Sequence, residues 1–431
     1  MRTSLAVALR QLVPPRGLIR SLAAQAMAYA VGFGVFQAGS AVFFTKVLGL
    51  DPTQVGLGLS AAAGVSMLVS VPLGTVIDRF GAQKVWLVSL LVEAALFAAY
   101  PFVEGFVGFL VVVTGLAVAA AGTDVARSVY SIAVLPSEDR VRALAYQRTA
   151  LNLGFAVGAG ISGLALAVGT ATGFQVMIVF AAAMPIVTAV FVRRLPRVAR
   201  QAPAAEPPTA AAEPRRRRHA ALADRPFLLV TLVSGILGAH HTLMLVVLPL
   251  WILDRTDAPA PVVALILLLN TALAVLLQVR ASRGAETAPG AGRALRRGGL
   301  LLAFACLILP ISTLTTGPVT IAILLAGAVV LTLAELVQSA GDWGLAATLP
   351  PDDRRGEYLG VFRLGRQLQQ LAGPVALTAL TVGTGGWGWL PMVVLFLAVA
   401  MAARPAVGWA VRRPRIGSAP TAPITTVTPV P

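Results

Sequence analysis

The sequence predicts an all-α integral membrane protein with twelve transmembrane helices in two pseudo-symmetric six-helix bundles. Of its 431 residues, 57% are hydrophobic and only 12% are charged, and the mean hydropathy is +0.82, which excludes an ordinary soluble protein. A helix needs about 20 apolar residues to cross a bilayer, and successive stretches of that kind follow one another along the chain. A short motif also repeats between the two halves of the chain, which indicates two related sets of six spans.

Polar segments separate these apolar stretches and divide the chain into five parts. We expect a cytoplasmic N-terminal tail at 1–21, a first bundle at 22–192, a cytoplasmic linker at 193–226, a second bundle at 227–410 and a disordered cytoplasmic tail at 411–431. The expected spans are about 22–45, 53–77, 85–103, 106–129, 143–168, 172–192, 227–253, 260–280, 298–316, 318–346, 358–383 and 387–410.

The basic residues lie almost entirely on one side of the expected spans. If the N-terminus is inside, the outer loops hold only Lys46 and Arg255. This bias predicts that both termini and the linker are cytoplasmic, in a multi-pass protein of the inner (plasma) membrane. The net charge of +16 also suggests nucleic acid as a partner, but the one-sided distribution favours contact with anionic lipid headgroups.

The repeated motif lies before the fifth span of each half. Leu135–Arg140 reappears as Leu349–Arg354, and with one inserted residue Arg148 corresponds to Arg363. Two six-helix bundles related by a pseudo-two-fold axis place a binding site at their interface.

The most specific signature is the polar turn after the second span, Gly-Thr-Val-Ile-Asp-Arg-Phe-Gly-Ala-Gln-Lys. Gly74 allows close backbone approach, and Gly81 supplies the freedom for the turn. The carboxylate of Asp78 can pair with a base or accept hydrogen bonds from helix N–H groups. Arg79 and Lys84 mark the cytoplasmic side.

This turn resembles the loop between the second and third helices of the major facilitator superfamily, Gly-x-x-x-Asp-Arg-x-Gly followed by basic residues. Gly74, Asp78, Arg79 and Gly81 match, and Lys84 is the base that remains after them. The resemblance covers most of the chain. It implies a transporter in which two bundles rock around a central site, with this turn acting at the inner gate.

Glycines on the fifth and eleventh spans predict close helix packing. Gly154, Gly158 and Gly163 are small residues four or five apart on the fifth span. They also resemble a degraded form of the superfamily's antiporter motif, Gly-x-x-x-Gly-Pro-x-x-Gly-Gly. Gly373 and Pro374 retain its Gly-Pro step in the second half. No strand precedes these glycines, so dinucleotide binding is not expected.

Charged side chains within the spans are candidates for function, because burying them costs several kcal/mol unless they are paired or face water. The fourth span has Asp124 and Arg127 on one helical face, and the tenth has Glu335, Gln338 and Asp342. Glu335 lies near mid-depth without a base on its own helix, which favours it as the proton carrier. Asp124 either forms a structural pair with Arg127, joins the acidic turn or carries a proton. Asp342 and Glu93 remain further candidates, and Glu93 has no clear partner.

A polar stripe opens the fifth span and another opens the eleventh. Their members are Arg148, Asn152, Arg363, Arg366 and Gln367. The arginines either hold the inner gate closed against acids of the other half or extend to the cytoplasmic interface, and we favour the second interpretation.

The first span carries residues that could line a substrate cavity, although simple helix packing explains them equally well. They are Tyr29, Phe33, Phe36 and Gln37, with Gln338 from the tenth span as a further candidate. His240 and His241 are adjacent, so they project about 100° apart and cannot jointly hold a metal from one helix.

The mostly apolar and aromatic lining resembles that of the drug-efflux members of the superfamily. The resemblance implies proton-driven export of a lipophilic small molecule, and such substrates include cations. The alternative is uptake of a polar metabolite by proton symport, which a cluster of polar residues in the central cavity would support. Neither an enzyme constellation nor a Gly-x-x-x-x-Gly-Lys-Ser/Thr loop is present. We expect a monomer that contacts its substrate, protons and membrane lipids, with no nucleic acid, cofactor or metal.

Overall fold

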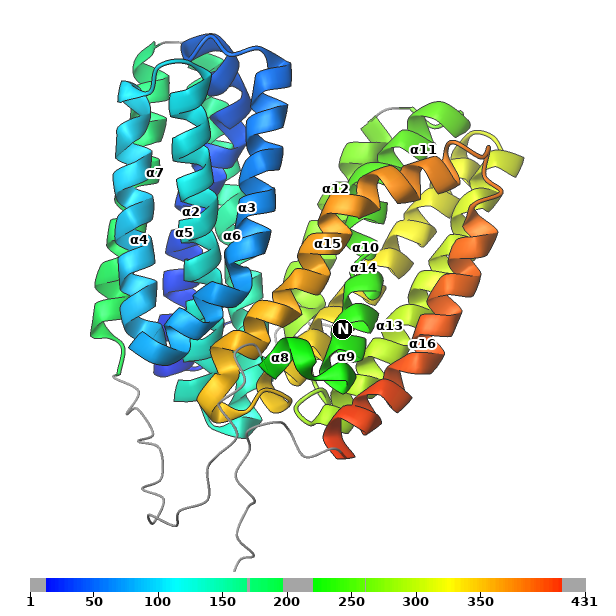
Figure 1. Cartoon of the computed structure of the whole chain (residues 1–431). Helices are drawn as coiled ribbons and strands as arrows, with labels where there is room; N and C mark the ends of the chain where they lie inside the picture. The colour runs from blue at the N-terminus through cyan, green and yellow to red at the C-terminus, as the bar shows by residue number, and fades with distance from the viewer. Residues whose placement is uncertain (1–12, 169–170, 197–219, 260, 413–431) are drawn as a thin grey trace, which may run out of the picture.

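The computed structural model describes residues 13–168, 171–196, 220–259 and 261–412. The predicted all-α class is confirmed, because the regular elements in these ranges are all helical. The helices form two bundles that lie side by side (Figure 1). The expectations for residues 1–12, for linker residues 197–219 and for 413–431 fall outside the described residues.

The first bundle contains six long helices. They are α2 (Leu18–Val42), continued by a π-helical turn (Phe43–Val47), α3 (Pro52–Phe80), α4 (Ala82–Ala99), α5 (Gly105–Val134), α6 (Ser137–Val168) and α7 (Ala171–Arg194).

The second bundle begins with a path of short helical pieces and continues with five long helices. The pieces are α8 (Ala220–Ala223), α9 (Arg225–Leu237), α10 (His240–Thr242), a π-helical turn (Leu243–Val247) and α11 (Leu248–Arg255). The long helices are α12 (Pro261–Ala281), α13 (Ala288–Ile308), α14 (Pro318–Thr348), α15 (Arg355–Thr381) and α16 (Trp389–Arg412).

Ten helices in the described part of the chain are long and apolar enough to cross a membrane. The path from Arg225 to Arg255 counts as one of them. Helices α6 and α15, with 32 and 27 residues, are as long as the others but fall outside this set. A polytopic membrane protein is therefore confirmed, and the count of twelve crossings stays a prediction.

Local sequence explains where several helices begin. Prolines stand in the first turns of α3, α9, α12 and α14, where a missing N–H costs nothing. The side chain of Asp224 accepts a hydrogen bond from the backbone of Phe227 and caps α9. Between α3 and α4, Gly81 has φ +91°, which a residue with a side chain rarely adopts. A single residue thus joins two long helices, as the turn motif predicts.

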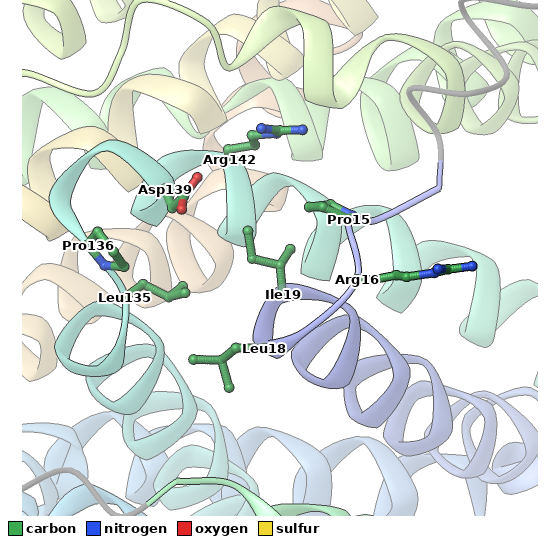
Figure 2. Close-up of a pocket in the computed structure, with 8 residues that line it drawn as sticks. All are labelled: Pro15, Arg16, Leu18, Ile19, Leu135, Pro136, Asp139 and Arg142. Carbon is green, nitrogen blue, oxygen red and sulfur yellow. The ribbon is translucent and has the colours of Figure 1, made fainter.

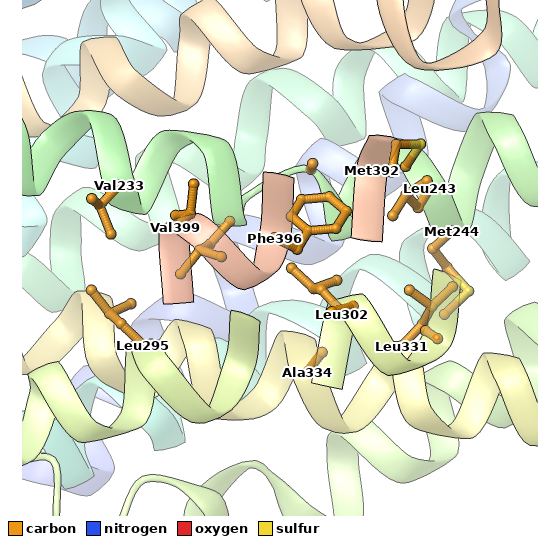
Figure 3. Close-up of a cluster of buried hydrophobic side chains, with 14 of the residues drawn as sticks. Val233, Leu243, Met244, Leu295, Leu302, Leu331, Ala334, Met392, Phe396 and Val399 are labelled. Atoms are coloured by element: carbon orange, nitrogen blue, oxygen red, sulfur yellow. The ribbon is translucent and has the colours of Figure 1, made fainter. Parts of the chain in front are cut away.

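Each bundle has its own hydrophobic core. In the first, Phe36 lies against Phe97, Phe44 and Tyr100, with ring centroids 4.8 to 5.9 Å apart. Phe36 is therefore a core residue, which contradicts its place among the cavity candidates. In the second, residues such as Leu302 and Phe396 interdigitate between α9, α13, α14 and α16 (Figure 3).

Glycines bring α2 and α6 into close contact. A Cβ atom on Gly154 would lie 2.5 Å from the carbonyl oxygen of Met27, and one on Gly158 would lie 2.2 Å from that of Val31. Any side chain at these positions would force the helices apart. On α15, a Cβ on Gly373 would lie 2.5 Å from the side-chain amide nitrogen of Gln369, on the same helix.

The two bundles meet at one end, which we call the linker end because α7 ends and α9 begins there. Val279, Ala347 and Leu359 of the second bundle pack into the core of the first, and all three lie within five residues of a helix end. Figure 1 shows the bundles diverging towards the opposite end. The contacts that join the halves are therefore concentrated at the linker end.

Candidate functional site

Asp78, near the end of α3, bonds to the first turn of α15 in the other bundle. Its Oδ1 accepts from the N–H of Gly356 at 2.7 Å, and its Oδ2 accepts from the N–H of Glu357 at 2.9 Å. The first N–H groups of a helix have no partner within that helix, and the N-terminus favours negative charge. One carboxylate therefore caps α15 across the bundle interface, and we call this contact the Asp78 latch.

Glycines on both helices permit this approach. A Cβ on Gly74 would lie 2.2 Å from the carbonyl oxygen of Gly356, and one on Gly356 would lie 2.4 Å from that of Gly74. One turn further, a Cβ on Gly360 would lie 2.6 Å from the carbonyl oxygen of Ser70. Beyond it, the Ser70 hydroxyl donates to Gln367 Oε1 at 3.0 Å. Gln367 thus belongs to the contact between α3 and α15.

The basic residues of the turn lie outside the latch. Arg79 and Lys84 are exposed, and the Arg79 guanidinium lies 5.4 Å from the centroid of the Phe80 ring. Gln83, which precedes Lys84, donates to the carbonyl oxygens of Val192 and Leu195 at 2.9 and 3.2 Å. It therefore ties the turn to the end of α7, a contact that sequence reasoning missed.

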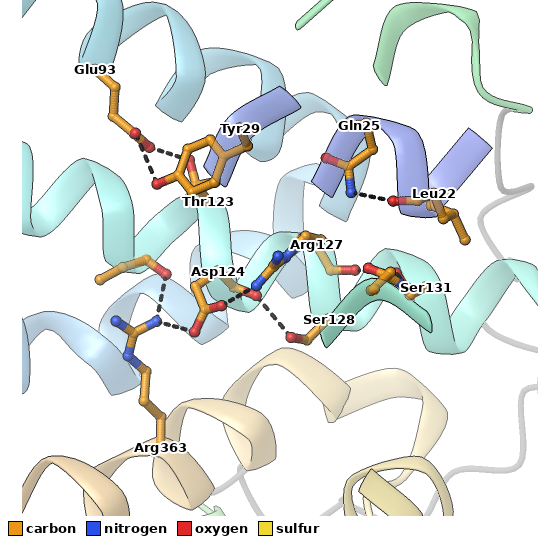
Figure 4. A network of polar contacts seen from close by, with 12 residues as sticks. Leu22, Gln25, Tyr29, Glu93, Thr123, Asp124, Arg127, Ser128, Ser131 and Arg363 are labelled. Carbon is orange, nitrogen blue, oxygen red and sulfur yellow. Dashed lines mark hydrogen bonds and ion pairs between the residues drawn. The ribbon is translucent and has the colours of Figure 1, made fainter. Parts of the chain in front are cut away.

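Asp124 forms a second link between the bundles (Figure 4). Its Oδ1 lies 2.5 Å from Arg127 on the same helix, and its Oδ2 lies 2.7 Å from Arg363 of α15. Arg363 also donates to the carbonyl oxygen of Ala121 at 3.3 Å. Two expectations are thereby corrected. Asp124 does not join the acidic turn, and Arg363 does not extend to the membrane interface, because a carboxylate of the other half holds its guanidinium.

Glu93 on α4, for which the sequence indicates no clear partner, has partners on two neighbouring helices. The Tyr29 hydroxyl of α2 donates to Oε2 at 3.0 Å, and the Thr123 hydroxyl of α5 donates to Oε1 at 2.5 Å (Figure 4). Glu93 is only 3% exposed. Tyr29 therefore bonds within the first bundle.

Glu335 on α14 faces groups from three other helices. Asn270 of α12 donates to its Oε2 at 3.0 Å. His240, which is buried, and Arg148 of α6 interact with it electrostatically. Because Arg148 belongs to the first bundle, Glu335 takes part in a charge interaction across the interface. The arrangement mirrors that of Asp124 and Arg363, since Arg148 and Arg363 correspond in the repeat.

Asp342 and Gln338 bond to each other on α14. The Gln338 amide donates to Asp342 Oδ2 at 2.8 Å, and the Ser234 hydroxyl of α9 donates to Oδ1 at 2.5 Å. Gln338 is 2% exposed, so it packs inside the second bundle and does not line a cavity, which corrects that expectation.

Three other candidates, Phe33, Gln37 and Asn152, take no part in the links described above. Phe33 is 43% exposed, and its ring centroid lies 6.2 Å from that of Phe155. Gln37 is exposed on α2, and Asn152 is half-buried on α6.

A cavity of about 140 Å³ lies between the bundles beside the Asp124–Arg363 ion pair. Helices α5, α6, α14 and α15 line it. Its charged lining consists of Asp124, Arg127, Arg148, Asp342, Arg363 and Arg366. Its other lining residues include Trp343, Phe362 and Leu151. Side chains from both halves therefore meet around one polar space.

A second cavity, of about 380 Å³, lies at the linker end of the first bundle (Figure 2). Arg16, just before α2, and Ile19, in its first turn, line it together with Leu135 of the α5–α6 connection and Asp139 in the first turn of α6. Only the first bundle contributes to it, so it does not lie at the interface between the halves. Within the described residues, no group of three or more His, Cys, Asp or Glu could hold a metal ion.

Two membrane bundles that converge at one end and share a charged cavity define a multi-pass transporter. Residues 22–374 match the family model of the Major Facilitator Superfamily. The chain belongs to this superfamily, so it is a transporter and not an enzyme. No curated protein matches the sequence.

Several solved transporters are similar to the whole chain. A bacterial homologue of the iron transporter ferroportin, in an outward-facing state, matches with a TM-score of 0.68 and 14% identity, over 92% of this chain and 99% of that one. The human organic anion transporter MFSD10 matches with a TM-score of 0.60 and 16% identity, over 90% and 98%. The Escherichia coli fucose:proton symporter FucP matches with a TM-score of 0.64 and 15% identity, over 90% and 98%. At these identities the likeness shows the fold alone.

Proposed function

We propose that the chain is a proton-coupled secondary active transporter that exports a lipophilic small molecule by alternating access. The observation that supports alternating access most directly is the cavity lined by both bundles, beside two links that hold the bundles together. Because the links and the cavity share α5 and α15, separating the bundles at the linker end would also change the cavity.

The two links keep the linker end closed in this conformation. Opening it requires Asp78 to leave the N-terminus of α15 and Asp124 to leave Arg363. If the linker is cytoplasmic, as the distribution of basic residues predicts, this conformation is outward-facing. Two of the similar structures, the ferroportin homologue and FucP, are described as outward-facing or outward.

Glu335 is the proposed proton carrier. It lies about 20 Å along α14 from Thr348 at a rise of about 1.5 Å per residue, and it faces Arg148 across the interface. Protonation from the outer side would make Glu335 neutral and release its attraction for Arg148. The bundles could then rock without a bare charge in a low-dielectric interior. Asp124 is the reserve candidate, because two arginines favour its ionised form.

Uptake of a polar metabolite by proton symport is the second candidate. The six charged side chains around the cavity favour a substrate with polar groups. FucP and XylE, which are similar in fold, are described as proton symporters for sugars. The direction of transport separates the two candidate functions. In a pump-deficient host, an exporter raises resistance to its toxic substrates, whereas an importer raises sensitivity to them.

Coupling is tested by measuring flux through the Glu335→Gln variant in proteoliposomes with an imposed pH gradient. The substrate is a compound to which the protein changes the resistance of the pump-deficient host. Because Gln mimics the protonated acid permanently, the variant should still bind substrate but lose at least about 90% of gradient-driven flux. Glu104→Gln, at an exposed acid just before α5, is the matched control and should retain flux. Undiminished flux in Glu335→Gln would exclude Glu335 as the carrier, and the same loss in Asp124→Asn alone would move the role to Asp124.

A further inference from the structure

The charges around the cavity between the bundles do not balance. Four arginines and two aspartates line it. Even when Glu335, which interacts with Arg148, is added to the acids, positive charges exceed negative ones by four to three. An excess of positive charge inside a membrane protein is costly unless an anion or water compensates it.

Three of the arginines also have donor groups to spare. Nη1 of Arg127 is buried without a hydrogen-bond partner, because only Nη2 bonds to Asp124. Among the described ion pairs closer than 4.0 Å, none includes Arg148 or Arg366. Arg366 is exposed on the face of α15 that borders the cavity. Arg363, in contrast, is already bound to Asp124.

The rest of the lining suits an apolar molecule. Trp343, Phe362 and Leu151 border the same space as the arginines, with further aliphatic side chains from α5, α6 and α15. Guanidinium groups match the oxygens of carboxylates, sulfonates and phosphates geometrically. The site therefore combines anion donors with an apolar wall.

We propose that this cavity binds the acidic group of an amphiphilic organic anion through Arg127, Arg148 and Arg366. The inference rests on the proposed transport function but not on its direction, and it names the class of substrate. It excludes lipophilic cations, because the net positive lining repels them. The acidic group lies against α5, α6 and α15, and the apolar body lies along Trp343 and Phe362.

Benzenesulfonate is a suitable probe, because it is a small aromatic anion that stays ionised at every working pH. Its binding to the purified full-length protein is measured by equilibrium dialysis of the radiolabelled compound. Benzyltrimethylammonium, a permanent cation of similar size, is the matched comparison. We expect saturable binding of the sulfonate and at least about tenfold weaker binding of the cation.

Two substitutions test the arginines. Arg148→Gln and Arg366→Gln should each weaken benzenesulfonate binding at least about tenfold, since a hydrogen bond to a charged group contributes about 1.5–3 kcal/mol. Arg366→Lys keeps the charge and should recover part of the loss. Arg193→Gln, at an exposed arginine near the end of α7, should bind like the parent. Thermal unfolding of each variant identifies any loss that comes from misfolding.

Equal binding of the cation, or unchanged affinity in both glutamine variants, would overturn the proposal. Absence of saturable sulfonate binding in a protein that transports another substrate would overturn this inference and leave the transport function intact. Sulfonate binding in a protein without gradient-driven flux would contradict the transport function alone.

Discussion

Asp78 has two kinds of partner available, and its position on α3 selects one of them. The bases nearest to it along the chain, Arg79 and Lys84, are exposed. Its carboxylate instead meets the first N–H groups of α15, which lack partners in their own helix. At the scale of single residues, Asp78 and Asp124 thus bind groups of the opposite bundle.

Substituting Asp78→Asn should reduce transport at least about tenfold while the protein still inserts and folds. Asparagine has a single carbonyl oxygen, so one of the two N–H groups faces an NH₂ group and the attraction between charge and helix dipole is lost. Initial flux, normalised to protein in the membrane, measures the effect. Asp51→Asn, at the exposed opposite end of α3, is the control and should transport normally. Normal flux in Asp78→Asn would show that the latch is dispensable.

Sequence reasoning located the charged residues but not the partners that lie far along the chain. The spacing of Asp124 and Arg127 predicts their pair, because residues three apart share a helical face. Nothing local indicates Arg363, 239 positions away. For Gln338, periodicity predicts which residues share its face but not whether that face meets a cavity or a neighbouring helix.

At the scale of elements, the crossing of α3 and α15 depends on glycines in both helices. Gly74 belongs to the turn motif, so the sequence predicts its close approach, whereas the facing Gly356 and Gly360 carry no motif. The position of α3, Pro52–Phe80, was predictable to within a few residues of the expected span 53–77. The expected span 298–316 begins ten residues later than α13, which starts at Ala288. The division of the expected span 227–253 into α9, α10, a π-helical turn and α11 was not predictable, since apolar periodicity does not report a change in hydrogen-bond register.

Gly74→Ala should open the linker end, because its methyl group would lie 2.2 Å from the carbonyl oxygen of Gly356. The distance between spin labels at Lys84→Cys and Arg283→Cys, in a Cys306→Ser background, reports this opening. Both sites are exposed: Lys84 lies in the first turn of α4, and Arg283 lies on the connection between α12 and α13. We expect a population with a longer distance than in the parent. Gly64→Ala, where a Cβ meets nothing within 4 Å, should keep the parent distribution; an identical distribution in Gly74→Ala would contradict this account of the crossing.

At the scale of the whole molecule, the two bundles converge at the end where the basic residues gather. Arg79, Lys84 and Arg283 lie there, and all three are exposed. Because basic loops stay on the cytoplasmic side, we propose that the linker end faces the cytoplasm.

Cysteine labelling tests this orientation. In the Cys306→Ser background, a membrane-impermeant maleimide should label Trp387→Cys in intact cells and Lys84→Cys only in inside-out vesicles. Trp387 is 77% exposed in the connection between α15 and α16, at the end opposite the linker. The reverse pattern of labelling would invert the topology.

The cap that Asp78 places on α15 also limits how firmly the closed shape can be held. A helix cap contributes about 0.5–2 kcal/mol, which biases the ratio of two populations roughly 2- to 30-fold. Once the bundles separate, water can hydrate the same N–H groups, so the closed shape is preferred rather than locked. The resting ratio of the two shapes is therefore adjustable by residues remote from the cavity. Substitutions of residues at the Asp78 latch should therefore alter the rate of turnover while leaving the preference among substrates unchanged.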